Sequence, residues 1–210
     1  MREHTLSTAR TARYFTLGPP EHAAEIWFVC HGYGQLAARF LERFRALEAE
    51  SRCIVAPEAL SRFYLTDSPG ERRVGASWMT REDRLHEIDD YVGYLDAVYR
   101  AVTPATAQVT ALGFSQGTAT VCRWAARGSS RLDRLILWGG EVPPDLDLKR
   151  LRVRDLTLVY GTRDQFFTPK IVAENETRLR EHGIDYELIS FEGAHEIDEP
   201  TLLRVASRRV

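Results

Sequence analysis

The stretch Gly113-Phe114-Ser115-Gln116-Gly117 decides how this chain folds. A β-like run, Gln108 to Leu112, leads into it, and a helix-like run, Thr118 to Arg127, leads out. The pattern Gly-x-Ser-x-Gly between a strand and a helix predicts a sharp turn that lifts one serine hydroxyl above a sheet. Both glycines have a steric reason, because a side chain at either position would crowd the neighbouring strand and helix. The helix points its first N–H groups at Ser115, where negative charge would develop during nucleophilic attack.

Outward from this turn, candidate strands and helices alternate along the whole chain. Continuous apolar runs such as Ile26 to Cys30 are typical of strands buried on both faces of a parallel sheet. We find no internal repeat, low-complexity tract or linker, so we expect one domain spanning residues 1–210. The sequence predicts a doubly wound, mostly parallel α/β sheet with helices on both faces. The expected strands are 13–17, 25–30, 52–56, 108–112, 135–138, 156–160 and 186–191; the expected helices are 36–50, 82–102, 118–127, 169–181 and 200–208; and a long loop is expected at 58–81.

Composition excludes several classes of protein. The 210 residues carry a formal net charge of -2 with a pI near 6.3, which gives no case for binding nucleic acid or an anionic membrane. Residues 1–13 are polar and lack the apolar core of a signal peptide, and no apolar run approaches the roughly 18 residues of a membrane span. The three cysteines show no Cys-x-x-Cys spacing and favour buried thiols in a reducing compartment. We therefore expect a soluble cytoplasmic protein.

Residues with catalytic chemistry follow four of the expected strands: His31-Gly32-Tyr33-Gly34, Ser115, Asp164 and His195. Sites in open α/β sheets form beyond the carboxyl ends of the strands, so these residues are expected to meet. The order Ser, Asp, His fits a nucleophile, an orienting acid and a base. A serine hydroxyl needs an adjacent base at neutral pH, and His195 can take its proton and return it to the leaving group. Asp164 would fix the tautomer of the imidazole.

Alternatives to each of these assignments stay open at this point. Ser115 could simply cap the helix that follows it, and Asp164 could cap its own turn. Asp185 or Asp198 could then be the acid, although both break the triad order. Five other histidines compete with His195 as the base; of these, His31 is expected to order the glycine loop, and the others are His4, His22, His86 and His182.

A nucleophilic serine also needs two backbone N–H donors aimed at one point, the oxyanion hole. One donor should be the N–H of Gln116, directly after the nucleophile. The other is expected from the glycine-rich loop after the first buried strand, at Tyr33. The glycines at positions 32 and 34 let that backbone come close to a substrate.

Taken together, these motifs resemble the phospholipase/carboxylesterase family, which includes bacterial carboxylesterases and acyl-protein thioesterases. The resemblance runs from about Ile26 to His195. It rests on four motifs: His-Gly-Tyr-Gly, Gly-Phe-Ser-Gln-Gly, Gly-Thr-Arg-Asp and Gly-Ala-His. It implies an α/β-hydrolase fold, no cofactor, and action on carboxylic esters or thioesters. It also implies Ser115, Asp164 and His195 as triad, with Tyr33 and Gln116 as oxyanion donors. The family includes dimers, which leaves a homodimer open.

The chain departs from the family in its glycine loop, where members often read His-Gly-Leu-Gly-Asp, and in the long loop at 58–81. These departures bear on substrate preference. The sequence contains no His-Glu-x-x-His motif, and its histidines lack the paired spacing of metal ligands, so it does not predict a metal site. The segment 139–150 is polar and broken by prolines, so we expect a minimal lid or none. Aromatic and other apolar residues that could either line the substrate pocket or belong to the core are Phe63, Tyr64, Trp78, Met79, Trp138, Phe166 and Phe167.

The leading functional hypothesis is a serine carboxylesterase acting on small-molecule esters with short or medium acyl chains. An acyl-protein thioesterase or lysophospholipase would need an apolar channel for a long chain, and the 58–81 loop is where it would be built. An acyltransferase would use the same acyl-enzyme with another acceptor in place of water. An inactive binding protein that kept the fold ranks lowest, because the whole triad is present.

Overall fold

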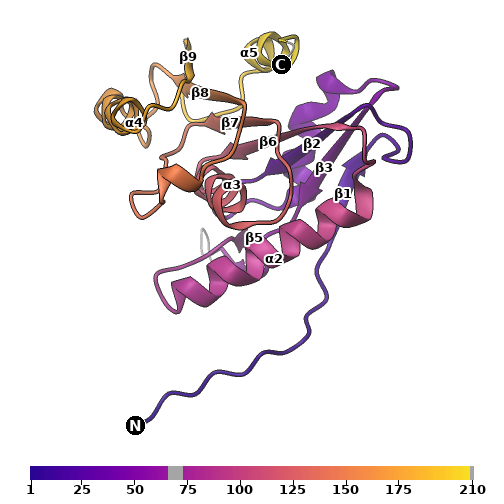
Figure 1. The fold of residues 1–210 in the computed structure, drawn as a ribbon, viewed down its shortest axis with the longest axis vertical. Helices are drawn as coiled ribbons and strands as arrows, with labels where there is room; N and C mark the ends of the chain where they lie inside the picture. The colour runs from indigo at the N-terminus through magenta and orange to yellow at the C-terminus, as the bar shows by residue number, and fades with distance from the viewer. Residues whose placement is uncertain (66–72, 209–210) are drawn as a thin grey trace.

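The computed structural model describes residues 1–65 and 73–208, and its centre is a seven-stranded sheet (Figure 1). The strand at one edge, β1, pairs antiparallel with its neighbour, and every other pairing in the sheet is parallel. This confirms the predicted mostly parallel α/β sheet. In spatial order the strands are β1 (Tyr14–Leu17), β3 (Arg52–Pro57), β2 (Glu25–Cys30), β6 (Gln108–Phe114), β7 (Arg134–Trp138), β8 (Asp155–Gly161) and β9 (Glu187–Phe191).

Helices cover both faces of the sheet because the strands are apolar on both sides. Along β2, Phe28 contributes to one core layer, and its neighbours Trp27 and Val29 contribute to the other. The first layer is closed by α2 (Arg84–Val102), α3 (Gln116–Arg127) and α4 (Pro169–Glu181). The second is closed by α1 (Ala37–Leu41), the 3₁₀ helix η1 (Glu42–Leu47) and α5 (Glu199–Ala206). The doubly wound α/β-hydrolase arrangement is thereby confirmed.

Two expected elements differ from the structure. The helix expected at 36–50 is a short α-helix that tightens into a 3₁₀ helix, although it buries the predicted apolar side chains Phe40, Leu41, Phe44 and Leu47. The expected loop at 58–81 contains a two-stranded antiparallel hairpin, β4 (Ser61–Tyr64) and β5 (Val74–Ser77). Neither Ser-Arg-Phe-Tyr nor Val-Gly-Ala-Ser alternates apolar with polar residues, so neither strand stands out from a loop in the sequence. Pro69, Gly70 and their neighbours in 66–72 lie outside the described residues.

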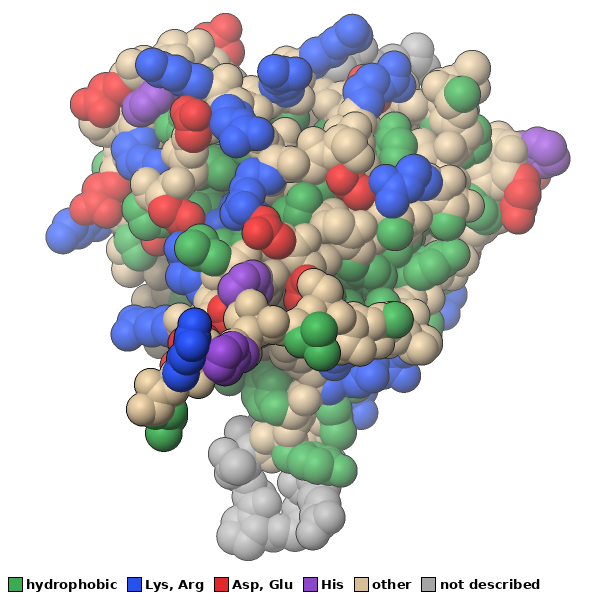
Figure 2. Space-filling model, turned by 60° about the horizontal axis from the view of Figure 1, so that its bottom comes forward, with side chains coloured by type: hydrophobic (Ala, Val, Ile, Leu, Met, Phe, Trp, Pro, Cys, Tyr) green, Lys and Arg blue, Asp and Glu red, His purple; other side chains and the backbone are tan. Residues whose placement is uncertain are grey.

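The connections at the carboxyl ends of the strands carry no helical lid among the described residues. The connection between β7 and β8 contains only the 3₁₀ turn η2 (Leu148–Arg150). Side chains of both charge signs are interspersed over the face of the molecule shown in Figure 2. No helix of the described residues is long and apolar enough to cross a membrane.

A buried carboxylate, Asp96 on α2, ties this helix to the turn after α3. Its two oxygens accept five hydrogen bonds, from the indole of Trp124 and from the N–H and hydroxyl groups of Ser129 and Ser130, at 2.6 to 3.2 Å. Burial raises the pKa of Asp96, but the hydrogen bonds from Ser130, Ser129 and Trp124 outweigh it, so the pKa lies below its ordinary value. The ionised form therefore stabilises the fold.

We predict that Asp96→Asn lowers the free energy of unfolding at pH 7 by about 2–3 kcal/mol, because an amide NH₂ would face donors. Urea unfolding of both proteins measures the loss. Because the folded pKa is depressed, the wild-type advantage is present above the ordinary aspartate value of 3.8 and disappears as pH falls below it. Asp89→Asn, on the exposed face of the same helix, is the control and should cost less than about 1 kcal/mol. Equal effects of the two changes would contradict the prediction.

Candidate active site

The turn at Ser115 is built by close backbone packing. Ser115 has φ 54° and ψ -118°, a strained conformation for a residue other than glycine. A Cβ at Gly117 would lie 2.1 Å from the carbonyl oxygen of Cys30, and one at Gly113 would lie 2.2 Å from that of Gly117. Glycine at these positions lets β6 and α3 meet at a sharp angle against the end of β2. Ser115 therefore stands at the N-terminus of the 12-residue helix α3, beyond the carboxyl end of a central strand.

Asp164 and His195, from the loops after β8 and β9, form a hydrogen-bonded pair. The Nδ1 atom of His195 lies 2.6 Å from Oδ2 of Asp164. The other carboxylate oxygen accepts the N–H groups of Phe166 at 2.8 Å and Phe167 at 2.9 Å. The Asp164 side chain is 1% exposed and that of His195 is 19% exposed. A carboxylate only accepts, so Nδ1 carries the proton and Nε2 is left as a base.

The Ser115 hydroxyl makes no hydrogen bond among the described residues, so its link to His195 is not formed in this structure. The residue before Ser115 nevertheless contacts His195. The ring of Phe114, directly before the serine, lies 4.7 Å from the His195 ring centroid to centroid. Two consecutive glycines after β7 pack on both sides of the site: a Cβ at Gly139 would lie 3.3 Å from Asp164 and His195, and one at Gly140 would lie 2.5 Å from the Ser115 carbonyl oxygen. Catalytic hydrogen bonds often tighten only when substrate is bound.

The competing candidates have other partners. Of the three carboxylates considered as the acid, Asp164 is the one that is hydrogen-bonded to His195. Asp198 instead caps α5 by accepting the N–H of Thr201 at 2.9 Å, and Asp185 is exposed. Among the histidines, His86 pairs with Asp83 on the surface, and His182 bonds the carbonyl oxygen of Arg178 at the end of α4. Neither contact brings these histidines to the turn at Ser115.

His31 orders the glycine loop, as predicted. Its ring is fully buried, and its Nε2 accepts the N–H of Ala59 at 3.1 Å, which leaves Nδ1 to donate to the Gly32 carbonyl oxygen at 2.8 Å. Burial lowers the pKa of His31, and both nitrogens already have the partners of a neutral ring. The Gln35 side chain, where the family often has aspartate, accepts the N–H of Gly32 at 2.8 Å.

The two expected oxyanion donors are both free to bind a ligand. Among the described residues, neither the N–H of Tyr33 nor that of Gln116 donates a hydrogen bond to the protein. Gly32, beside Tyr33, lies against the turn at Ser115, because a Cβ there would be 3.2 Å from Cβ of Ser115. The loop that carries one donor is therefore packed against the turn that carries the other.

The residues expected to line a pocket divide into two groups. Trp78, Trp138 and Phe167 are at most 3% exposed, so they belong to the core rather than to an open wall. The two indole N–H groups are also used internally, on the carbonyl oxygens of His31 and Glu196. An apolar residue after a strand has the same pattern whether it faces the core or a cleft, so the sequence alone left both outcomes open.

The exposed group lies on two sides of the candidate site. Phe166 is 74% exposed, and its ring centroid lies 5.0 Å from that of His195. Tyr33 is 61% exposed, and its ring lies 5.1 Å from that of half-buried Phe63 on β4. Tyr64 is exposed and Met79 is half-buried. The hairpin thus brings an aromatic side chain to the glycine loop that carries Tyr33.

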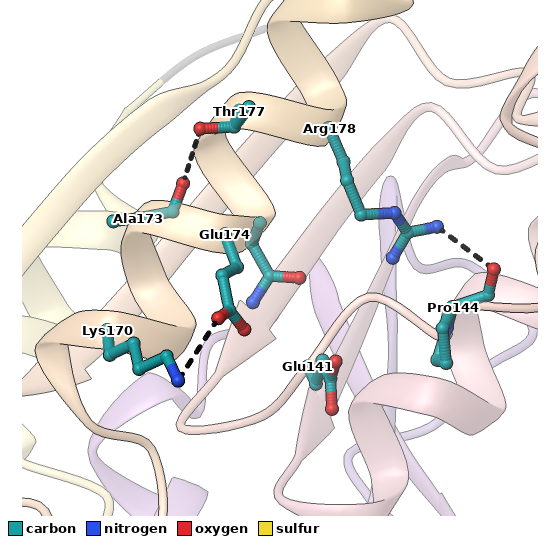
Figure 3. Close-up of a pocket in the computed structure, with 8 residues that line it drawn as sticks. Glu141, Pro144, Lys170, Ala173, Glu174, Thr177 and Arg178 are labelled. Carbon is teal, nitrogen blue, oxygen red and sulfur yellow. Dashed lines mark hydrogen bonds and ion pairs between the residues drawn. The ribbon is translucent and has the colours of Figure 1, made fainter.

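A hollow of about 550 Å³ lies between α4 and the connection after β7 (Figure 3). Lys170 and Glu174 pair across one turn of the helix, and Arg178 reaches the carbonyl oxygens of residues 142 and 143. None of the predicted catalytic or pocket residues lines this hollow, so it is separate from the candidate site. Within the described part of the chain, no group of three or more His, Cys, Asp or Glu side chains is arranged to hold a metal ion.

Comparison with known proteins agrees with this architecture. The sequence model of the Dienelactone hydrolase family matches residues 23–196. Crystal structures with the same fold include esterase PE8 (21% identity, 94% of this chain and 97% of that one, TM-score 0.71) and Zea mays acyl-protein thioesterase 2 (16%, 93% and 96%, 0.71). A carboxylesterase from Mesorhizobium loti is similar (20%, 94% and 95%, 0.71). No curated protein matches the sequence. These matches are consistent with the predicted resemblance to the phospholipase/carboxylesterase family of α/β-hydrolases.

A side chain added at Gly139 tests whether the Asp164–His195 pair takes part in turnover. We predict that Gly139→Ala lowers kcat for a p-nitrophenyl ester about 10- to 100-fold, because a Cβ would press on both Asp164 and His195. Gly139 also has φ +58°, so the change adds backbone strain.

Gly183→Ala is the matched control, because Gly183 has φ +65° but nothing lies within 4 Å of its Cβ position. It should cost similar stability and leave kcat within about two-fold of wild type. Steady-state kinetics and thermal unfolding of both variants separate the two effects. A Gly139→Ala enzyme as active as Gly183→Ala would show that the pair does not take part in turnover.

Proposed function

The chain belongs to the dienelactone hydrolase family, and on that premise we propose that it is a serine carboxylesterase. It would hydrolyse short- to medium-chain carboxylic esters through an acyl-enzyme on Ser115. The observation that carries the proposal is the Asp164–His195 hydrogen bond of 2.6 Å beside the strained turn at Ser115. An orienting carboxylate, a base and a serine at a helix N-terminus are the parts that acyl transfer requires.

The proposed reaction follows from these groups. His195 Nε2 takes the proton of the Ser115 hydroxyl as its oxygen attacks the ester carbonyl carbon. The resulting oxyanion accepts hydrogen bonds from the N–H groups of Tyr33 and Gln116, with the N-terminus of α3 adding favourable potential. The tetrahedral intermediate collapses, and the alcohol leaves with the proton from His195. Water then attacks the acyl-enzyme by the same route and releases the acid, so no cofactor or metal enters the proposed mechanism.

Short acyl chains suit the exposed aromatic side chains around the site. Phe166 on the His195 side, and Tyr33 with Phe63 on the oxyanion side, are walls open to solvent. Each added methylene gains at most about 0.8 kcal/mol, and only where it finds dry surface to bury against. Methylene groups that extend beyond these side chains would lie in solvent and add no further binding free energy.

We predict that Ser115→Ala reduces kcat for p-nitrophenyl butyrate by at least about three orders of magnitude, because no other hydroxyl would reach the ester carbon. A fluorophosphonate should label wild-type protein at Ser115 alone, as read by peptide mass spectrometry. The alanine variant keeps its stability to within about 1 kcal/mol, which serves as the folding control. Retention of more than about a tenth of wild-type kcat would rule out this nucleophile.

Chain-length dependence separates the esterase from the thioesterase alternative. With p-nitrophenyl esters below their critical micelle concentrations, we predict that kcat/KM rises from acetate to butyrate or hexanoate and then falls. A steady rise through palmitate, or far better turnover of an S-palmitoyl peptide, would contradict the short-chain proposal. An acyl-protein thioesterase or lysophospholipase would then be the better description.

A further inference from the structure

The two oxyanion donors proposed above lie on different elements and need a fixed separation. The N–H of Gln116 belongs to the first turn of α3, and the N–H of Tyr33 belongs to the loop between β2 and α1. Both must point at one oxygen atom within hydrogen-bonding distance. The rigid turn at Ser115 fixes the first donor. The second is on a loop, so other contacts must hold it.

The hairpin strand β5 holds the Tyr33 loop. Ala76 accepts the N–H of Gly34 at 2.9 Å and donates its own N–H to the carbonyl oxygen of Gln35 at 3.1 Å. Gly75 packs directly on this bridge, because a Cβ there would lie 2.5 Å from the carbonyl oxygen of Gly34. The residues that follow Tyr33 are thus paired with β5 like a short strand, and the direction of the Tyr33 N–H depends on where β5 lies.

The side chain of Gln116 in turn holds the end of β5. Its Oε1 atom accepts the backbone N–H of Trp78 at 3.1 Å, and its Nε2 atom donates to the Met79 carbonyl oxygen at 2.9 Å and the Ser77 hydroxyl at 3.0 Å. A backbone N–H only donates and a carbonyl only accepts, so these partners fix the orientation of the amide. The Ser77 hydroxyl completes the link by donating to the Met79 carbonyl oxygen at 2.9 Å.

We propose that the Gln116 carboxamide is a positioning group that sets the second oxyanion donor relative to the first. Gln116 supplies one donor from its backbone, and its side chain fixes β5, which fixes Gly34 and Gln35 and hence the N–H of Tyr33. A single residue therefore couples both halves of the oxyanion hole. The side chain acts through the protein and does not touch the substrate. This inference rests on the proposed esterase function.

The test replaces Gln116 by methionine, which has similar volume, no charge and no hydrogen bonds to offer, and keeps the backbone N–H. We expect kcat for p-nitrophenyl butyrate to fall about 10- to 100-fold with KM changed less than three-fold, because the oxyanion exists only after attack. The affinity of a trifluoromethyl ketone, which mimics the tetrahedral state, should fall by the same factor as kcat/KM. Ser77→Ala should shift the same two quantities in the same direction, about 3- to 10-fold.

The control is Glu87→Met, which removes another side-chain anchor of the same segment at a point away from the oxyanion loop. Glu87 on α2 accepts the N–H of Thr80 and the hydroxyl of Ser61. Its kcat and inhibitor affinity should stay within three-fold of wild type, and all assays run at least 10 °C below each variant's Tm.

Outcomes that overturn the proposal are equally clear. Gln116→Met with kcat/KM and inhibitor affinity within three-fold of wild type would do so, as would equal losses in Gln116→Met and Glu87→Met. Fluorophosphonate labelling of wild-type protein separates this failure from failure of the function. A wild type that reacts at Ser115 and turns over esters keeps the esterase proposal whatever Gln116 does. An unlabelled, inactive wild type would overturn both.

Discussion

The contact of Gly117 with the end of β2 is the constraint on which the rest of the site depends. Its backbone lies so close to the carbonyl oxygens of Cys30 and His31 that any side chain would overlap them. This approach brings the first turn of α3 beside the loop that leaves β2. The strained conformation of Ser115 follows from the same packing, since the chain must reverse within one residue between β6 and α3. A different residue at 117 would separate Ser115 from the loop that carries Tyr33.

Glycine contacts bring the loops that carry Asp164 and His195 to the same edge of the sheet. Gly161 ends β8 against the backbone of Gly193 and Ala194, so the loop carrying Asp164 packs on the loop carrying His195. Gly139, directly after β7, leaves room for both side chains, and Gly140 next to it packs on the carbonyl oxygen of Ser115. The buried Asp164 then needs partners, which it finds in His195 and in two N–H groups of its own loop. One oxygen of Asp164 is therefore held by its own backbone and the other by His195, as a preorganised site requires.

The fold is shared with esterases and a thioesterase at identities of 16 to 21%, so it does not by itself select a substrate. In this chain the hairpin β4–β5 contacts the loop that carries Tyr33. It presents Phe63 to the Tyr33 ring, and its second strand is bonded to Gly34 and Gln35. Substrate preference and oxyanion geometry would thus depend on one short element.

The sequence by itself determined the sheet, the turn at Ser115 and the order of the candidate triad, because these rest on local signals. The signals are unbroken apolar runs, Gly-x-Ser-x-Gly between a strand and a helix, and polar residues after strand ends. It did not determine the hairpin, because its strands show no alternation of apolar and polar residues and its second strand is hydrogen-bonded to Gly34 and Gln35, which are distant in sequence. Nor did it separate buried Trp78, Trp138 and Phe167 from exposed Phe166. The direction of a side chain after a strand, and the partners of the Gln116 amide, are decided only when the loops pack against one another.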